Sequence, residues 1–304
     1  MDKYLLHIKA KEDKYIRLIL SSEENTLFIE KYIDFNEWQS IENSFLCIRE
    51  EINKKIRNNL FPRIELRNLK NDVESFLKKF LFYPENEIIR LKVIWQANIF
   101  LPLEICKRNL EVLNFISSDK KSSKNSNNVV LIYSDDINHS KEENFILAGI
   151  LKDRNKNLSI EYFSENDFDS YRSDLLSARL IHFSTHGRVN HRKGEISLNG
   201  NWCDSLNQRL NAEIVFLNSC EAGCYPEGIV SNLLSSGAEC VIASPFELYD
   251  NLDWQKKLLD FYKSFDFSKE AEKNYLEFRN KNYLFALFFR LFNVCPAFNF
   301  LREK

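Results

Sequence analysis

The sequence predicts an α/β protein with a mainly parallel β-sheet, preceded by a smaller α+β region. Two observations support this prediction. From residue 128 onward, short apolar runs alternate with helical patterns, an order that produces a parallel sheet covered by right-handed crossovers. Before residue 117, strand-like segments come first and helical patterns follow. The chain has 304 residues, 44 % of them hydrophobic, which is enough for a sizeable core.

The N-terminal region, residues 1–116, starts with three strand-like segments, KYLLHIKA, YIRLIL and TLFIEKYI. Helical patterns follow around 37–59 and 68–82, and NIFLPLEIC at 98–106 indicates a further strand or a short helix. The next segment, SSDKKSSKNSNN at 117–128, contains no apolar side chain. Such a segment buries no surface that would offset its ordering entropy, so we expect a linker or loop there.

The second domain, residues 129–304, follows this linker. Its first strand is expected at NVVLIY, a continuous apolar run typical of a strand buried on both faces. Further strands are expected at LSIEYF, RLIHFST, AEIVFLNS and AECVIAS. Helices are expected at 141–152, 167–177 and 227–237, the last one ending at Gly237.

The apolar run near the C-terminus, YLFALFFRLFNVCPAFNF, predicts a buried amphipathic helix rather than a helix on a membrane surface. Less apolar residues recur at helical spacing, at Arg279, Asn282, Ala286, Arg290 and Asn293. Arg290, Asn293 and Pro296 interrupt the run well short of the roughly 18 unbroken apolar residues of a membrane span.

Charge and cysteine content restrict the class of protein. Lysine and arginine (42) nearly balance aspartate and glutamate (44), so we expect neither a nucleic-acid nor a membrane partner. The first residues do not resemble a signal peptide, and seven scattered cysteines do not form a disulfide framework. We therefore expect a cytoplasmic protein with reduced cysteines, and neither a metal nor a cofactor.

Two predicted strands end in residues that can carry chemistry. His186 and Gly187 follow RLIHFST, and Cys220 follows AEIVFLNS. In parallel sheets, functional sites gather beyond the carboxyl ends of the strands. If these strands are neighbours, the imidazole and the thiol project from one rim, where the histidine can activate the thiol as a nucleophile. A structural role is the alternative for each residue taken alone.

The other histidines and cysteines are expected to be structural. His182 lies within its strand as a hydrogen-bonded core residue, and His191 lies in a solvated loop. Buried, inert thiols are expected for the cysteines in apolar or amphipathic patterns: Cys47, Cys106, Cys203, Cys240 and Cys295. Cys224 is expected to be inert as well, with a redox link to Cys220 as the alternative. The G-x-S-x-G, phosphate-loop and H-E-x-x-H motifs are absent.

The segments IHFSTHG, LNSCEAG and EGIVSNLLSSGAECVIASPFELYD resemble, in this order, the CHAT peptidases of the caspase-like clan that includes separase. The resemblance covers about 128–260. It implies a caspase-like three-layer α/β/α sandwich. Residues 1–116 would then be a reduced first half of the CHAT module or a docking surface, and GEISLNGNWC at 194–203 a small hairpin.

The resemblance implies that His186 is the catalytic histidine and Cys220 the nucleophile. The backbone N–H groups of Gly187 and Cys220 would form the oxyanion hole. The family needs no third side chain to orient the histidine, and no convincing candidate is visible in this sequence. The spacing from His186 to Cys220 is 34 residues, shorter than the roughly 50 of caspases, which excludes a caspase proper.

Substrate binding is assigned to Asp135, Asn218 and Phe246. Relatives that cleave after a basic residue commonly have an aspartate two positions before the cysteine, where this chain has Asn218. A neutral pocket floor favours apolar or small side chains, although Asp135, Asp136 or Asp250 could supply a charge from a loop.

The resemblance implies a cysteine endopeptidase that cleaves a specific protein, with an activating protein partner. A role in bacterial defence or regulated cell death, for example by activating a gasdermin-like effector, is also implied. Two alternatives remain open on the residues alone: a catalytically silent interaction module that retains the fold, and a thiol enzyme acting on a non-peptide acyl group.

Overall fold

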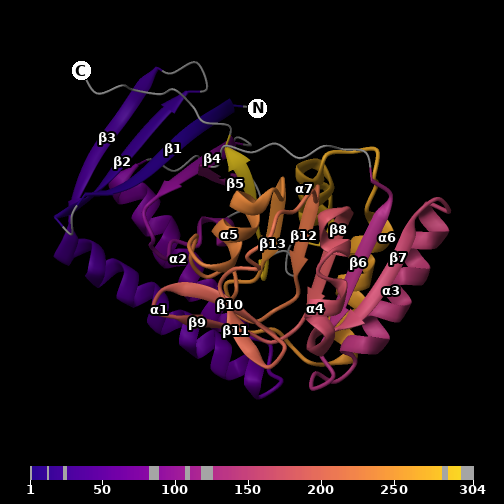
Figure 1. Ribbon diagram of the computed structural model, residues 1–304. Helices are drawn as coiled ribbons and strands as arrows, with labels where there is room; N and C mark the ends of the chain where they lie inside the picture. Colours follow the sequence, from indigo (N-terminus) through magenta and orange to yellow (C-terminus); the bar gives the residue numbers. More distant parts are fainter. Residues whose placement is uncertain are drawn as a thin grey trace.

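A computed structural model describes residues 2–11, 14–22, 26–81, 89–106, 110–117, 126–282 and 287–295. Within these ranges, one large sheet runs through both halves of the chain (Figure 1). Its eleven strands lie in the order β3-β2-β1-β4-β5-β14-β13-β12-β8-β6-β7. Most neighbours are parallel, and the antiparallel pairs are β1–β2, β2–β3 and β13–β14. The expected mainly parallel α/β fold is confirmed.

The N-terminal strands form one end of this sheet, and two helices pack on one of its faces. Their apolar side chains share one core cluster, which includes Trp38 of the first helix and Leu69 of the second. Asp34 caps the first helix by accepting a hydrogen bond from the backbone N–H of Asn36. The bounds are β1 Asp2–Lys11, β2 Tyr15–Ser22, β3 Leu27–Asp34, α1 Phe35–Arg57, α2 Arg63–Phe80, β4 Ile89–Gln96, a short 3₁₀ helix Leu103–Ile105, and β5 Leu110–Ser117.

The second half of the sheet is covered on both faces. α3 and α6 pack on one face beside the side chain of Phe216, and α5 packs on the other beside Val215. Its strands are β6 Asn128–Tyr133, β7 Ser159–Ser164, β8 Ala178–Ser184, β12 Ile214–Leu217 and β13 Cys240–Ala243. Its helices are α3 Ser140–Arg154, α4 Phe168–Tyr171, α5 Ile229–Ser236, α6 Leu252–Ser264 and α7 Ala271–Lys281, with 3₁₀ turns at Glu165–Asp167 and Asp174–Leu176.

Two element predictions are wrong. The expected helix at 167–177 consists of the single turn of α4 between two 3₁₀ turns. The expected C-terminal amphipathic helix is replaced at Arg290–Cys295 by strand β14, which lies between β13 and β5; residues 283–286 and 296–300 of the expected helix lie outside the described residues. Arg290 is buried and donates a hydrogen bond of 3.0 Å to Glu104. The polar side chain that suggested a solvent-facing stripe therefore lies in the core. Most of the expected linker, residues 118–125, lies outside the described residues.

A separate small sheet of three strands follows β8 in the chain. Its strands are β9 Gly187–Asn190, β10 Lys193–Leu198 and β11 Asn201–Cys203, paired antiparallel. The segment 194–203 thus forms the expected hairpin. Asn199 and Gly200 make its turn with positive φ angles of 50° and 69°, which suits a two-residue hairpin turn.

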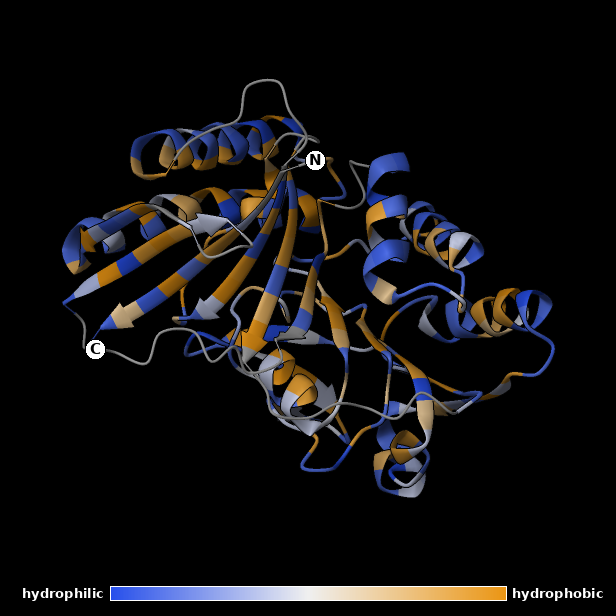
Figure 2. Ribbon diagram, turned by 90° about the horizontal axis from the view of Figure 1, so that it is seen from above, coloured by the Kyte–Doolittle hydropathy of each residue, from blue (hydrophilic) through white to orange (hydrophobic). Residues whose placement is uncertain are grey.

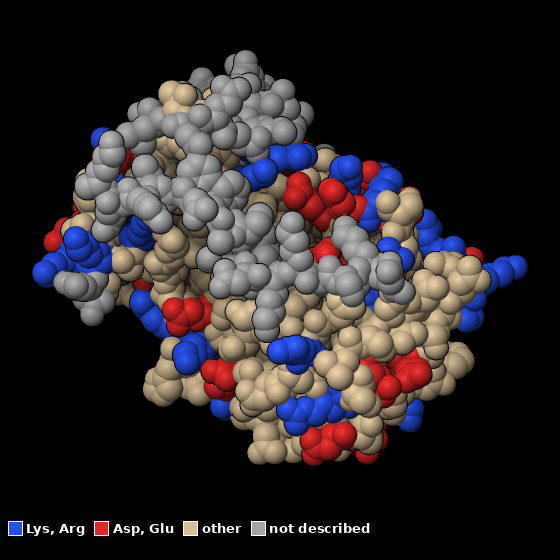
Figure 3. All heavy atoms as spheres, turned by 45° about the horizontal axis from the view of Figure 1, so that its top comes forward, with Lys and Arg blue, Asp and Glu red and all other residues tan. Residues whose placement is uncertain are grey.

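The hydropathy of the elements follows this architecture. Figure 2 shows long hydrophobic stretches on the strands. The helices, in contrast, carry both hydrophobic and hydrophilic segments. Positive and negative side chains are interspersed on the face seen in Figure 3. Within the described ranges, no helix combines the length and the hydropathy needed to cross a bilayer.

Candidate active site

Strands β8 and β12 bring the two chemistry-bearing segments together. They are parallel neighbours, with Phe183 opposite Leu217. Beyond the strand ends, the Asn218 N–H donates to the Phe183 carbonyl at 2.8 Å, and the hydroxyls of Thr185 and Ser219 lie 3.3 Å apart. β12 is buried along its length and β8 along nearly all of it, which explains their mostly apolar sequences. The residues that follow therefore emerge at the same rim of the sheet.

Gly187 packs directly on the backbone of Cys220. A Cβ atom at position 187 would lie 2.3 Å from the Cys220 carbonyl oxygen and 2.9 Å from the Cys220 nitrogen. Only glycine permits this approach without displacing the backbone. The requirement for glycine after the histidine thus comes from the contact between the two chain segments, in addition to any space needed by a substrate.

His186 and Cys220 line the same pocket, which has a volume of about 140 Å³. The His186 side chain is exposed, and its backbone carbonyl accepts a hydrogen bond of 2.9 Å from Ser197 of β10. Cys220 is half-buried. Among the described residues, no hydrogen bond joins the imidazole to the thiol. The sheet places both groups at one cavity, where a substrate carbonyl can lie between them.

The Cys220 thiol is protonated at neutral pH. Burial raises its pKa to about 11, although the Leu248 N–H, which donates to its Sγ at 3.4 Å, lowers it. The thiolate fraction at pH 7 is then on the order of 10⁻⁴. For this thiol to react as a nucleophile, a base must remove its proton, and His186 and His139 are the histidines among the described lining residues of the pocket.

We expect the rate of Cys220 alkylation by iodoacetamide to rise about tenfold per pH unit from pH 7 and to level off near pH 11. Mass spectrometry of the Cys220 peptide measures this rate separately from the other cysteines. Because the folded-state pKa lies above that of free cysteine, stability is unaffected at neutral pH and falls as the pH rises from 9 to about 11. A plateau of the rate below pH 9 would contradict the burial of this thiol.

One wall of the pocket carries a buried carboxylate that the sequence interpretation missed. Glu143 of α3 accepts hydrogen bonds from the Asn218 side-chain amide at 3.1 and 3.2 Å. His182 lies 3.0 Å from the same carboxylate through Nε2 and 2.8 Å from the Tyr262 hydroxyl through Nδ1. His182 is fully buried, as expected for a hydrogen-bonded core residue. Asn218 therefore lies against a buried carboxylate at the wall of the pocket, and His182 pairs with the same carboxylate.

The pocket contains further acidic residues and no basic side chain other than histidine. Asp136 and Asp250 line it, and neither lysine nor arginine is among its described lining residues. Of the three predicted substrate-binding residues, only Asn218 lines it. Asp135 lies outside the pocket and accepts a hydrogen bond of 2.5 Å from Ser164. Phe246 is buried, with its ring centroid 5.8 Å from that of Phe288, and it is not among the described lining residues of the pocket.

Glu165 is a second carboxylate that the sequence did not reveal. It is buried beyond the end of β7, where Ser134 Oγ donates to its Oε1 at 2.7 Å and its Oε2 has no hydrogen-bond partner. Burial raises the pKa of Glu165, while the Ser134 hydrogen bond and the positive charge of His186 lower it. Its backbone carbonyl is bound by Asn199, two residues from the Ser197 that binds His186. The sequence feature that could have pointed to Glu165 is its position directly after β7, where it is a polar residue at the end of a strand.

The remaining histidines and cysteines mostly follow the predictions. His191 is exposed in the β9–β10 turn, and Cys106 and Cys240 are buried. Cys47 is exposed on α1, so the prediction of a buried thiol is wrong there, because it lies on the outward face of an amphipathic helix. Cys224 is buried, and its sulfur accepts a hydrogen bond of 2.7 Å from Arg49. Among the described residues, no cluster of three or more potential ligands could hold a metal ion.

Comparison with known proteins supports the fold. The structure is similar to separase in the crystal structure of the Saccharomyces cerevisiae separase–securin complex, with a TM-score of 0.58 and 10 % sequence identity. The similarity covers 96 % of this chain but only 30 % of separase. At this identity the likeness shows a shared fold and nothing finer. No family model matches the chain, and no curated protein matches it in sequence.

Proposed function

We propose that this protein is a cysteine endopeptidase of the CHAT type that cleaves a protein substrate through His186 and Cys220. The convergence of these two residues at one pocket, with Gly187 packed on the Cys220 backbone, is the observation that supports the proposal most. The separase-like fold is consistent with a protease of the caspase-like clan. The sequence motifs supply the finer assignment to CHAT peptidases.

The reaction starts with a neutral thiol. As the substrate carbonyl enters the pocket, His186 removes the Cys220 proton and the sulfur attacks the carbonyl carbon. The N–H groups of Gly187 and Cys220 donate to the developing oxyanion. His186 then protonates the leaving amine, and water hydrolyses the thioester to release the new C-terminus.

The proposed substrate carries a basic side chain before the cleaved bond. Glu143, Asp136 and Asp250 give the pocket negative charge, and Glu143 is desolvated enough for that charge to discriminate strongly between side chains. This proposal reverses the expectation that was based on Asn218 alone. The Asn218 amide donates hydrogen bonds to the Glu143 carboxylate, so the two residues together would form the binding site for the basic side chain.

We expect cleavage of a fluorogenic peptide series to favour arginine or lysine over leucine, alanine and aspartate by about tenfold or more in kcat/KM. Glu143→Gln is expected to remove most of this preference, because the amide keeps the size and the acceptor oxygen but loses the charge. Asp153→Asn, on the exposed part of the same helix, is the matched control and should leave the preference unchanged. A preference for leucine in the wild type would contradict the basic specificity.

The endopeptidase proposal is tested by labelling new protein N-termini in a cell extract treated with wild-type protein or with Cys220→Ala. Wild-type-dependent termini are the expected result, and they would also identify the substrate. Their absence after supplementation with the extract of the native host, which contains any activating partner, would contradict the proposal. An activating partner, a cytoplasmic location and a role in bacterial defence or cell death, such as activating a gasdermin-like effector, belong to the same proposal.

A catalytically silent interaction module is the second candidate. The raised pKa of Cys220 and the absence of a thiol–imidazole hydrogen bond among the described residues favour it. The close packing of Gly187 on Cys220 argues for the peptidase, because a module without turnover has no need to hold these two backbone segments in such close contact beside the pocket. Biological activity that persists in Cys220→Ala would select the module.

A further inference from the structure

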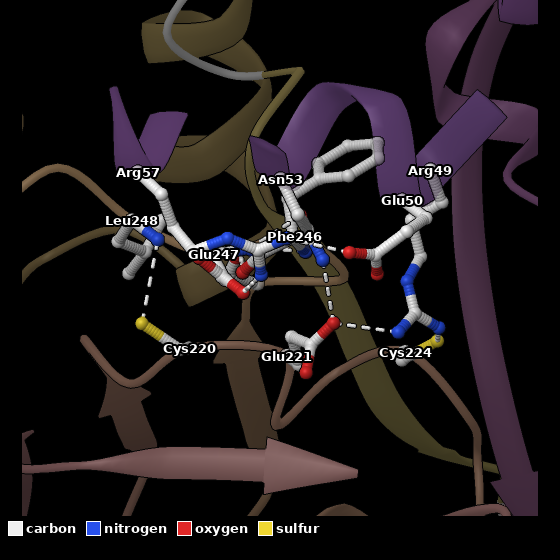
Figure 4. Close-up of polar contacts among 11 residues, drawn as sticks. Arg49, Glu50, Asn53, Arg57, Cys220, Glu221, Cys224, Phe246, Glu247 and Leu248 are labelled. Carbon is white, nitrogen blue, oxygen red and sulfur yellow. Dashed lines mark hydrogen bonds and ion pairs between the residues drawn. The ribbon is translucent and has the colours of Figure 1, made fainter. Parts of the chain in front are cut away.

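Helix α1 of the N-terminal half reaches the loops that border Cys220 (Figure 4). The residue after the nucleophile, Glu221, has a φ angle of 56°. This left-handed conformation is strained for a residue with a side chain, and it persists only where surrounding contacts hold it. The contacts that hold the Glu221 side chain come from α1, more than 160 residues away in sequence.

Two side chains of α1 bind the Glu221 carboxylate at the same oxygen. Arg49 donates to Glu221 Oε1 at 2.5 Å, and the Asn53 amide donates to it at 2.6 Å. Both α1 side chains are shielded from solvent, and Asn53 is fully buried. Charge-assisted bonds in such an environment are stronger than exposed ones. The turn that begins at Cys220 is therefore anchored to the N-terminal half.

Asn53 also binds the loop on the other side of the nucleophile. Its side-chain oxygen accepts a hydrogen bond of 2.9 Å from the backbone N–H of Glu247. The next backbone N–H, that of Leu248, donates to Cys220 Sγ at 3.4 Å. The Glu247 carboxylate forms an ion pair with Arg57, and the Tyr249 hydroxyl donates to the Leu60 carbonyl at 2.9 Å. A single buried amide thus joins the two loops between which the sulfur lies.

We propose that Asn53 is a positioning residue for Cys220, acting through Glu221 on one side and through Glu247 and Leu248 on the other. This inference rests on the proposed function of Cys220 and deepens it. The N-terminal half then forms part of the active site, although none of its residues lines the pocket among the described side chains. Movement of α1 would change the position of the nucleophile.

Asn53→Ala removes the donor to Glu221 and the acceptor for Glu247 in one step. We expect kcat/KM for peptide cleavage to fall about 10- to 100-fold, because a small displacement of the reacting sulfur causes a loss of this size. We also expect the released loop to admit water to the sulfur, so that Cys220 is alkylated severalfold faster at pH 8 while cleavage is slower. Asn43→Ala, an exposed asparagine of the same helix, should change neither quantity.

Residue-resolved alkylation separates this local effect from unfolding. Cys106 and Cys240 are buried, lie outside α1 and the two loops that it binds, and report on the fold as a whole. In Asn53→Ala we expect faster labelling at Cys220 with unchanged labelling at both reporters. Asn53→Asp keeps the volume and the acceptor for Glu247 but replaces the donor to Glu221 by a second buried carboxylate. Repulsion between the two carboxylates should therefore release the Glu221 side of the link, and faster labelling of Cys220 than in the wild type is expected. In a Glu221→Ala background, Asn53→Asp should have little further effect.

The proposal is overturned if Cys220 is alkylated at the wild-type rate in both Asn53 variants, or if labelling rises equally at Cys106 and Cys240. Alkylation does not depend on peptidase activity. A protein that cleaves nothing even with native host extract added, but shows faster Cys220 labelling in Asn53→Ala, would therefore refute the proposed function and leave the positioning role intact. Normal cleavage with unchanged labelling in these variants would refute the positioning role alone.

Discussion

Replacing Cys220 by alanine is expected to lower kcat/KM for peptide cleavage by about 10⁴-fold or more, because the covalent step loses its nucleophile. The free energy of unfolding should change by no more than about 1 kcal/mol. Among the described residues, the sulfur accepts one long hydrogen bond, from Leu248 at 3.4 Å, and Cys220 is half-buried. Steady-state kinetics and urea unfolding of the same preparations measure the two quantities.

Replacing His186 by alanine tests the second residue of the proposed dyad with the same two measurements. The His186 side chain is exposed and makes no hydrogen bond to another described side chain, so its removal should leave the free energy of unfolding within about 0.5 kcal/mol. We expect a loss of kcat/KM similar to that of Cys220→Ala, and no larger loss in the double variant, because the two residues act as a unit. His191→Asn, in the exposed β9–β10 turn at a φ of 46°, is the control and should remain active. An active His186→Ala variant would exclude the proposed dyad.

Gly187→Ala is the second change with a large expected effect. The new Cβ would meet the Cys220 carbonyl oxygen at 2.3 Å, so one of the two backbone segments must move. We expect kcat/KM to fall at least about 100-fold through displacement of the oxyanion donors. Overpacking should also lower the free energy of unfolding by about 1–3 kcal/mol.

Gly149→Ala is the matched control for this substitution. Gly149 lies within α3, and a Cβ there would meet no atom within 4 Å. Alanine is favoured over glycine in a helix by about 0.5–1 kcal/mol, so this variant should be slightly more stable and fully active. Full activity of Gly187→Ala would show that the backbone contact with Cys220 does not serve catalysis.

Much of the main sheet could be predicted from local patterns. β6, β8, β12 and β13 are buried on both faces, so each appears in the sequence as a short, nearly uninterrupted apolar run. Because parallel strands expose their carboxyl ends at one rim, the residues after β8 and β12 could be assigned to one site. The prediction of a helix up to Asn293 was wrong because a buried Arg290 paired with Glu104 has the spacing of a polar helix face.

The sequence alone therefore indicated the type of sheet and placed His186 and Cys220 directly after strands of that sheet, because both inferences depend on local patterns and on strand direction; that the two strands are neighbours came from the structure. The tertiary structure decided the charge of the pocket, where Glu143 is brought from α3 to Asn218. It also decided how Cys220 is held, since Asn53 binds the two flanking loops from α1. Contacts between residues far apart in the chain have no periodicity that a single sequence can display, and only the packing of the helices on the sheet reveals them.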